Sequence, residues 1–366
     1  MKIVFRTDAS IQIGTGHVMR CLTLADALRL EGADCTFICR AHTGHLIELI
    51  RAQGHHVVAL AAHEAPIIDT ASSTTSAHAI WLGTDWITDA SDTQNAIGSS
   101  TVDWLVVDHY ALDESWEKAM RTHCHRIMAI DDLADRRHDC DLLLDQNLGR
   151  TEEHYRQLIP RTATSLIGPR YALLRPEFSA LREESLAKRK HPQLKHLLIT
   201  LGGVDKDNVT GNVLNELRSC DLPSELHITV VIGAHAPWLQ NVQDAAEAMP
   251  WSTQVLVNVK HMARLMVDSD LAIGAAGGTA WERCSLGLPS LMIVTAENQR
   301  NGAASMQKIG AAFLCRSHSD ISAFMKNSIL SSNQHTLMKQ QSMAAAAITT
   351  GNGATLVLNK LRHLYV

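Results

Sequence analysis

The residues best placed to do chemistry lie near the amino terminus, in the run Arg6-Thr-Asp8-Ala-Ser-Ile-Gln-Ile-Gly14-Thr-Gly16-His17-Val-Met-Arg20-Cys-Leu. A short apolar strand leads into a loop containing Gly14 and Gly16, and His17 then opens a helix. At a helix amino terminus, free N–H groups and the helix dipole disfavour an added positive charge, so a neutral imidazole is expected. His17 is therefore a candidate general base, although a histidine alone in such a place can also be a polar loop cap. Asp8 follows the strand and could orient a histidine or position the loop.

Two glycine-rich loops in the second half are candidate anion sites. Gly202 and Gly203 follow an apolar run, and the run Gly274-Ala-Ala-Gly277-Gly278-Thr279 follows another and opens a helix. Glycines let an anionic group approach backbone N–H groups, and a helix amino terminus suits a phosphate oxygen. Taken alone, Gly202 and Gly203 also fit a tight strand-to-helix turn. The N–H groups of Gly278 and Thr279, with the threonine hydroxyl, make the stronger phosphate seat.

Other polar residues stand near these loops or at strand ends. Glu282, one turn beyond Thr279, could accept hydrogen bonds from a ribose diol or only complement the helix dipole. Asn298 and Gln299 follow an apolar strand, and their amides suit hydroxyl and phosphate recognition or helix capping. Tyr110 follows the apolar run 104–107, where its phenol could reach a sugar or be buried.

Composition favours an enzyme that acts on a small molecule. The 366 residues exceed what one hydrophobic core usually supports, and the net charge of −5 comes with dispersed basic residues. We therefore expect two domains and no nucleic-acid partner. The eight cysteines show no C-x-x-C pair, so we expect reduced core thiols in the cytoplasm. No apolar run approaches the length of a membrane span, and we expect a monomer.

The carboxylates of Asp131, Asp132 and Asp145 also end apolar strands. They have no flanking histidines, which makes them a weak set of metal ligands. We expect no essential metal and no cofactor.

Apolar strands alternate with helical stretches in both halves, which predicts two doubly wound parallel sheets facing a cleft. The strands expected in the first half are 3–5, 36–39, 56–60, 104–107, 127–130 and 142–144, and those in the second half are 196–201, 226–232, 254–257, 271–273, 290–294 and 312–315. Between 61 and 100 the pattern weakens, and a partly irregular insert is expected. We expect a first domain over 1–172, a linker over 173–193, a second domain over 194–350 and a helix over 351–366 that crosses back to the first domain.

The amino-terminal run resembles the signature D-A-x-x-x-I-G-x-G-H-x-x-R-C of the UDP-sugar hydrolases of the pseudaminic acid pathway, which serves flagellin glycosylation. The resemblance extends over nearly the full chain and implies that His17 is the catalytic base. The run from Gly274 to Arg283 resembles the nucleotide-binding signature of B-type glycosyltransferases. That resemblance implies that the Val259 backbone reads uracil with Met262 nearby, and that Asn298 and Gln299 contact the substrate.

The resemblance implies a specific reaction. Water would attack the anomeric carbon of UDP-2,4-diacetamido-2,4,6-trideoxy-β-L-altropyranose with inversion, releasing UDP. The alternatives are a glycosyltransferase using the same donor site and a UDP-sugar binding protein without turnover.

Overall fold

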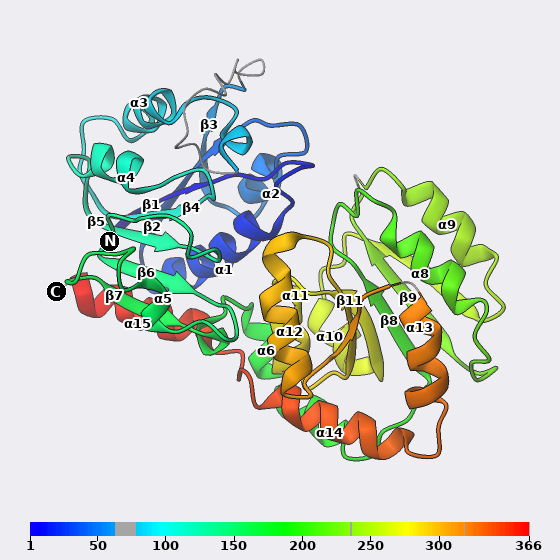
Figure 1. Ribbon diagram of the computed structural model, residues 1–366. Coiled ribbons are helices and arrows are strands. Elements are labelled where there is room, and N and C mark those ends of the chain that lie inside the picture. Colours follow the sequence, from blue (N-terminus) through cyan, green and yellow to red (C-terminus); the bar gives the residue numbers. More distant parts are fainter. Residues whose placement is uncertain (63–77, 235, 318, 366) are drawn as a thin grey trace. The chain divides into compact units, whose positions relative to one another are not determined.

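The computed structural model describes residues 1–62, 78–234, 236–317 and 319–365. The chain divides into two compact units, each built on one parallel sheet (Figure 1). The first unit is Met1–Leu173 with Ala354–Val366, and the second unit is Leu174–Gly353. Residues 63–77 of the expected irregular insert lie outside the described residues.

The sheet of the first unit has seven strands in the order β3-β2-β1-β4-β5-β6-β7. The strands are β1 (Lys2–Thr7), β2 (Asp34–Arg40), β3 (His56–Leu60), β4 (Val102–Asp108), β5 (Cys124–Ile130), β6 (Leu142–Asp145) and β7 (Thr164–Ile167). The helices are α1 (Gly16–Leu30), α2 (Ile47–Ala52), η1 (Ala79–Leu82), α3 (Trp86–Ile97), α4 (Glu114–Met120), α5 (Glu152–Tyr155), η2 (Pro169–Tyr171) and α15 (Gly353–Tyr365). Strand order reverses between β1 and β4, so the loops after these two strands flank the switch point, where doubly wound folds bind ligands.

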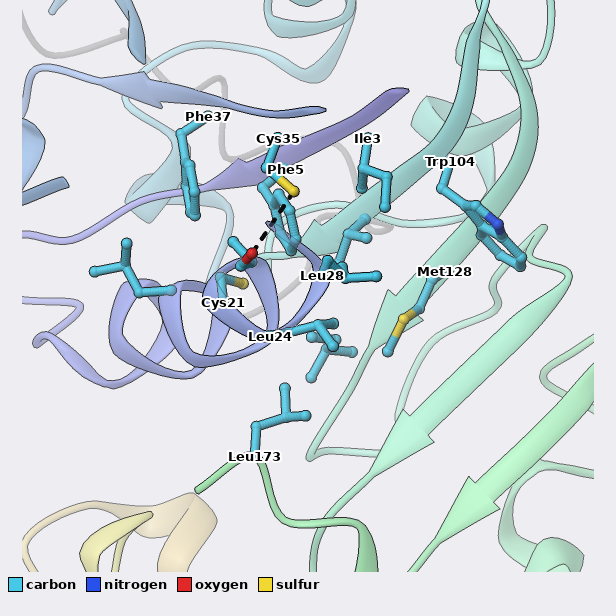
Figure 2. Packing of buried hydrophobic residues seen from close by; sticks show 14 of the residues in the cluster. Ile3, Phe5, Cys21, Leu24, Leu28, Cys35, Phe37, Trp104, Met128 and Leu173 are labelled. Carbon is cyan, nitrogen blue, oxygen red and sulfur yellow. Dashed lines mark hydrogen bonds between the residues drawn. The ribbon is translucent and has the colours of Figure 1, made fainter. Parts of the chain in front are cut away.

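Helix α1 covers one face of this sheet because its apolar positions repeat at helical spacing. Leu24 and Leu28 are fully buried against the sheet, where the rings of Phe5 and Phe37 stack with centroids 4.8 Å apart (Figure 2). Gly32 follows the helix at a φ of +81°, a conformation that glycine adopts readily. This packing fixes the start of α1, and therefore His17, next to the end of β1.

The carboxy-terminal helix α15 completes the core of the first unit. Val357 and Leu361 are 0% exposed and belong to the same cluster as Leu166 of β7 and Leu173. On the surface of the unit, Arg362 forms an ion pair with Glu31 at 2.6 Å. The end of the chain is therefore a structural part of the first unit.

The sheet of the second unit has six strands in the order β10-β9-β8-β11-β12-β13. The strands are β8 (His196–Thr200), β9 (His227–Ile232), β10 (Ser252–Val257), β11 (Leu271–Ala275), β12 (Ser290–Ile293) and β13 (Phe313–Cys315). The helices are α6 (Pro176–Ala180), α7 (Arg182–Lys188), α8 (Val209–Leu217), α9 (Leu239–Glu247), α10 (Met262–Asp268), α11 (Thr279–Ser285), η3 (Glu297–Gln299), α12 (Arg300–Lys308), α13 (Ser319–Phe324), η4 (Met325–Ile329) and α14 (Gln334–Ala346). Here the switch point lies between β8 and β11.

The segment expected as a linker, 173–193, contributes helices α6 and α7 to the second unit. Arg189, which follows α7, is buried and donates to the carbonyls of Met266, Ser269 and Leu286 at 2.8 to 3.1 Å. Burial lowers the pKa of its guanidinium to about 10. The arginine thus satisfies carbonyl groups at the ends of α10 and α11.

The twelve expected strands are all present, and β7 is an additional strand that the sequence pattern did not predict. The four residues of β7 form the edge of the sheet, with only Leu166 buried, and Gly168 and Pro169 follow immediately. So short an edge strand shows no clear apolar alternation.

Seven of the eight cysteines are buried, Cys220 is half-buried, and all eight are free. Among the described residues, no helix combines the length and apolar character needed to cross a membrane.

Candidate active site

His17 pairs with Asp108 at the switch point of the first sheet. Nδ1 of His17 lies 2.6 Å from Oδ1 of Asp108, which ends β4, and both residues are buried. Because an ionised carboxylate only accepts hydrogen bonds, Nδ1 of His17 is the donor in this pair, and Nε2 is the ring nitrogen on the other side of the imidazole. Among the described residues, no protein group bonds Nε2. The pair has the arrangement of an imidazole base oriented by a buried carboxylate.

Arg20 keeps this carboxylate ionised. It lies one turn after His17 and donates to both oxygens of Asp108, from Nε at 2.6 Å and from Nη2 at 2.7 Å. Burial alone would raise the pKa of Asp108, but Arg20 and His17 outweigh that effect and hold it well below its usual range. The third nitrogen of Arg20 donates to Asp132 at 2.7 Å.

Aromatic rings surround His17 on one side. The Tyr110 ring meets the imidazole edge-on with centroids 4.6 Å apart, and its hydroxyl donates to Asp132 at 2.8 Å. Trp81 of η1 stacks on Tyr110 at 5.7 Å, and His78 contacts both rings. Tyr110 is only 3% exposed, so its ring supports His17 and Trp81 while its hydroxyl is engaged inside the protein.

Asp8 is separate from this pair. It is 0% exposed, accepts hydrogen bonds from the Arg6 guanidinium and the Arg40 backbone, and lies 3.5 to 3.6 Å from the imidazoles of His42 and His109. From the sequence we expected Asp8 either to orient a histidine or to position the loop. In the structure it lies beside the imidazoles of His42 and His109, and not beside His17. A substrate has no access to so deeply buried a carboxylate.

Gly14 and Gly16 shape the loop before His17. Gly14 has a φ of +81° and donates to the Ser10 carbonyl at 2.8 Å, which closes a turn. Gly16 is the first residue of α1. Among the described residues, a Cβ built on either glycine would meet no atom within 4 Å apart from its chain neighbours, so neither glycine is packed against another part of the described first unit.

Loops at the carboxyl edge of the second sheet hold most of the other candidate residues. Gly274 to Thr279 follow β11, and Gly202 and Gly203 follow β8, so the two glycine loops flank the switch point. Gln299 lies beside the first loop, since a Cβ on Gly277 would be 3.3 Å from its Nε2. The side-chain oxygen of Gln299 is held by Thr295, which leaves Nε2 directed toward the glycine loop.

The loop before α11 presents several hydrogen-bond donors. Among the described residues, the N–H groups of Gly277 and Gly278 have no protein acceptor. Thr279 Oγ1 accepts a bond from Arg283 Nη1 at 3.2 Å, so its own O–H remains a donor. With Gln299 Nε2, this geometry suits an anion with several oxygens.

Glu282 is largely buried on α11, with 16% of its side chain exposed. Burial raises the pKa of its carboxyl to about 7, against the opposing effect of Arg175, whose Nη2 lies 3.8 Å away. Burying a carboxylate with only one long ion pair lowers the free energy of unfolding. Ionisable side chains kept in so unfavourable a place are often found in binding sites.

The remaining candidates lie farther from this loop or are less constrained. Gly202 has a φ of +103°, and the carbonyl of Gly203 packs so closely on Gly233 that a Cβ there would lie 2.0 Å away. Val259 and Met262 are half-buried after the edge strand β10, two strands from β8. Asn298 is exposed in η3.

No cluster of three or more His, Cys, Asp or Glu side chains suited to a metal ion occurs in the described part of the chain. Sequence reasoning did not assign roles to Asp108, Arg20, Trp81, His78 or Arg283. For Asp108 a signal existed, because it ends the strand that forms the switch point with β1.

Comparison with known proteins agrees with this architecture. Residues 196–357, which cover most of the second unit, match the glycosyltransferase family 28 C-terminal domain. The crystal structure of Acinetobacter baumannii MurG is similar, with a TM-score of 0.69 at 14% identity over 99% of both chains. The fold is that of the B-type glycosyltransferases. The expectation of two doubly wound, Rossmann-like domains is therefore confirmed.

Two curated relatives share most of the chain. The UDP-2,4-diacetamido-2,4,6-trideoxy-beta-L-altropyranose hydrolase of Campylobacter jejuni is 26% identical over 85% of this chain and 97% of its own length. An uncharacterized protein of Methanocaldococcus jannaschii is 26% identical over 82% of this chain. This chain spans 57% of the length of that archaeal relative.

Proposed function

We propose that this protein hydrolyses a UDP-linked sugar at its anomeric carbon, releasing UDP. The observation that carries the proposal is the Asp108–His17 pair, whose Nε2 is free to take a proton from water. The 26% identity to the Campylobacter jejuni hydrolase supports UDP-2,4-diacetamido-2,4,6-trideoxy-β-L-altropyranose as the substrate.

The reaction is a single displacement. Water attacks the anomeric carbon opposite UDP, its proton passes to His17 Nε2, and the bond from carbon to the phosphate oxygen breaks with inversion. The leaving electron pair stays on the diphosphate, where the N–H groups of Gly277 and Gly278 and the Thr279 hydroxyl stabilise it. Gly202 and Gly203 supply a second glycine loop for the diphosphate.

The nucleoside is assigned to the second unit. Glu282 accepts hydrogen bonds from the ribose hydroxyls, and the Val259 backbone with Met262 receives uracil. Asn298 and Gln299 contact the diphosphate or the sugar. Gly14 and Gly16 leave the surface near His17 open for the sugar and water.

A glycosyltransferase is the second candidate, because residues 196–357 match a glycosyltransferase domain. Such an enzyme would use the same donor site and pass the sugar to an acceptor hydroxyl in place of water.

The experiment is incubation with the UDP-sugar in oxygen-18 water, without any acceptor, followed by mass analysis of both products. Label in the free sugar supports hydrolysis at the anomeric carbon. Label in UDP would mean attack at phosphorus and would overturn the mechanism. No release of UDP would favour the glycosyltransferase or a binding protein. His17→Leu should abolish release while UDP affinity stays within about threefold, since the base does not contact the nucleotide.

A further inference from the structure

Arg283 is a buried cation directly beneath the glycine loop that precedes α11. It is 1% exposed, and its Nη2 donates to the Ala275 carbonyl at 2.7 Å while its Nη1 donates to Thr279 Oγ1 at 3.2 Å. Its guanidinium therefore joins the two ends of the loop. A planar group with several fixed donors is suited to such a bridge.

Gly274 makes room for this arginine. A Cβ at position 274 would lie 2.4 Å from Nη1 of Arg283, nearer than atoms can approach. Glycine within a strand is otherwise unfavourable and marks a close approach of another group. In contrast, a Cβ on Gly278 would meet no other atom of the described residues within 4 Å. The absence of a side chain at Gly274 therefore leaves space for the buried guanidinium, whereas the absence of one at Gly278 leaves space outside the loop.

The positive charge of Arg283 lacks an ion-pair partner within the described part of the chain. Its Nε has no hydrogen bond, and Glu282, its sequence neighbour, attracts it only from a distance. Burial lowers the pKa of the guanidinium to about 10, which still leaves it charged at neutral pH. A buried charge without a close counterion is unfavourable unless an anion compensates it.

We propose that Arg283 is a positioning residue for the diphosphate, holding the loop from beneath and supplying the positive charge that balances the bound anion. This inference rests on the proposed function, because it takes the loop as the diphosphate site. Arg283 acts through the backbone of the loop and the Thr279 hydroxyl, which accepts from the arginine and donates to a phosphate oxygen. The contribution is therefore specific for ligands that carry phosphate.

The test compares UDP and uridine binding by calorimetry in the wild type and in Arg283→Met. We expect the substitution to weaken UDP binding at least about tenfold, because bonds involving a charge are lost, and to change uridine binding less than about twofold. Arg283→Lys keeps the charge without the two-point bridge, so its UDP affinity should be intermediate. This variant also serves if Arg283→Met does not fold.

Arg189→Met is the matched control, since Arg189 is another buried arginine of the second unit that bonds only backbone carbonyls. It should lower stability while leaving the ratio of UDP to uridine affinity unchanged. Equal losses for UDP and uridine in Arg283→Met, or unchanged UDP binding, would overturn the role of Arg283. If the wild type itself binds no UDP, the proposed function fails first.

Discussion

At the scale of residues, the candidate site joins the His17 imidazole to a buried carboxylate that the Arg20 guanidinium also binds. Asp108 accepts hydrogen bonds from the His17 imidazole and the Arg20 guanidinium, and these donors stabilise its negative charge. The carboxylate in turn fixes the proton on Nδ1 and leaves Nε2 as the basic atom. The hydrogen bond to Asp108 therefore orients the His17 ring.

Asp108→Asn should lower kcat by about 10² to 10⁴-fold, because an amide can donate to Nδ1 and stabilise the wrong tautomer. UDP affinity should change little, since the nucleotide contacts are assigned to the second unit. Steady-state kinetics and UDP binding measure the two effects. Asp26→Asn is the control, because Asp26 contacts His55 at 2.9 Å in the same unit but does not contact His17. A kcat near that of the wild type would remove Asp108 from its role.

Glu282→Gln should make the ligand-free protein more stable at pH 8. The folded-state pKa of Glu282 is about 7 and its ordinary value is 4.5, so the folded state binds the proton more tightly. The unfolding free energy therefore falls as pH rises from 4.5 to 7, by about 3 kcal/mol from this group, and is level above. Glutamine removes this cost and, by losing the carboxylate, should weaken UDP binding.

Denaturant unfolding of wild type and variant between pH 4.5 and 8 measures this difference. Glu225→Gln, at an exposed position, should leave the pH dependence as in the wild type. If Glu282→Gln bound UDP with unchanged affinity, the ribose assignment would be wrong.

At the scale of elements, helix α3 anchors the segment that carries Trp81. Asp89 of α3 is fully buried and accepts bonds from Arg6 of β1 and Arg40 of β2 at 2.6 to 3.1 Å. Trp116 of α4 donates to the same carboxylate. Since Asp89 is tied to the centre of the sheet, the short helix η1 just before it is held in place as well. Trp81 consequently stacks on Tyr110 in a fixed position near His17.

Trp81→Ala should raise KM for the UDP-sugar by about 2 to 10-fold, the range expected for one aromatic contact, while UDP affinity stays constant. The half-buried indole offers an apolar surface near the base that suits methyl and acetamido groups. Trp86→Ala is the control, because Trp86 is 41% exposed on α3 and forms no ring contact in the described structure. An unchanged KM in Trp81→Ala would show that η1 does not face the sugar.

At the scale of the whole molecule, the chain forms two units and returns to the first unit at its end. The proposed base and its hydrogen-bond partners belong to the first unit, and the candidate nucleotide contacts belong to the second. The core of the first unit includes α15, so residues more than 300 positions after His17 stabilise the unit that carries it.

Leu361→Ala should destabilise the first unit by about 2 to 5 kcal/mol, because Leu361 is fully buried and truncation leaves a cavity. UDP affinity should stay within about twofold. Leu356→Ala on the same helix is the control, since Leu356 is 42% exposed and should cost little. Thermal unfolding and calorimetric titration with UDP measure both quantities, and a marked loss of UDP affinity would contradict the assignment of nucleotide contacts to the second unit.

Local patterns in the sequence were enough to predict the fold class and to place the glycine loops after their strands. Twelve strands could be located from short apolar runs that alternate with helical stretches. A strand covered by helices on both faces of the sheet is buried on both sides, so nearly all of its residues are apolar. The apolar runs missed β7, since an edge strand of four residues needs few apolar residues. The position of His17 at the start of a helix also followed from local glycines and apolar spacing.

Tertiary structure alone decided which residues meet. The Asp108–His17 contact joins residues 91 positions apart, and it exists because β1 and β4 are neighbours in the sheet. The sequence showed Arg283 only as the last residue of the run that resembles a nucleotide-binding signature, and its place beneath the glycine loop depends on the space left at Gly274. Sequence spacing specifies local hydrogen bonds and apolar faces, whereas contacts between distant side chains depend on strand order and on the volume that packing leaves free.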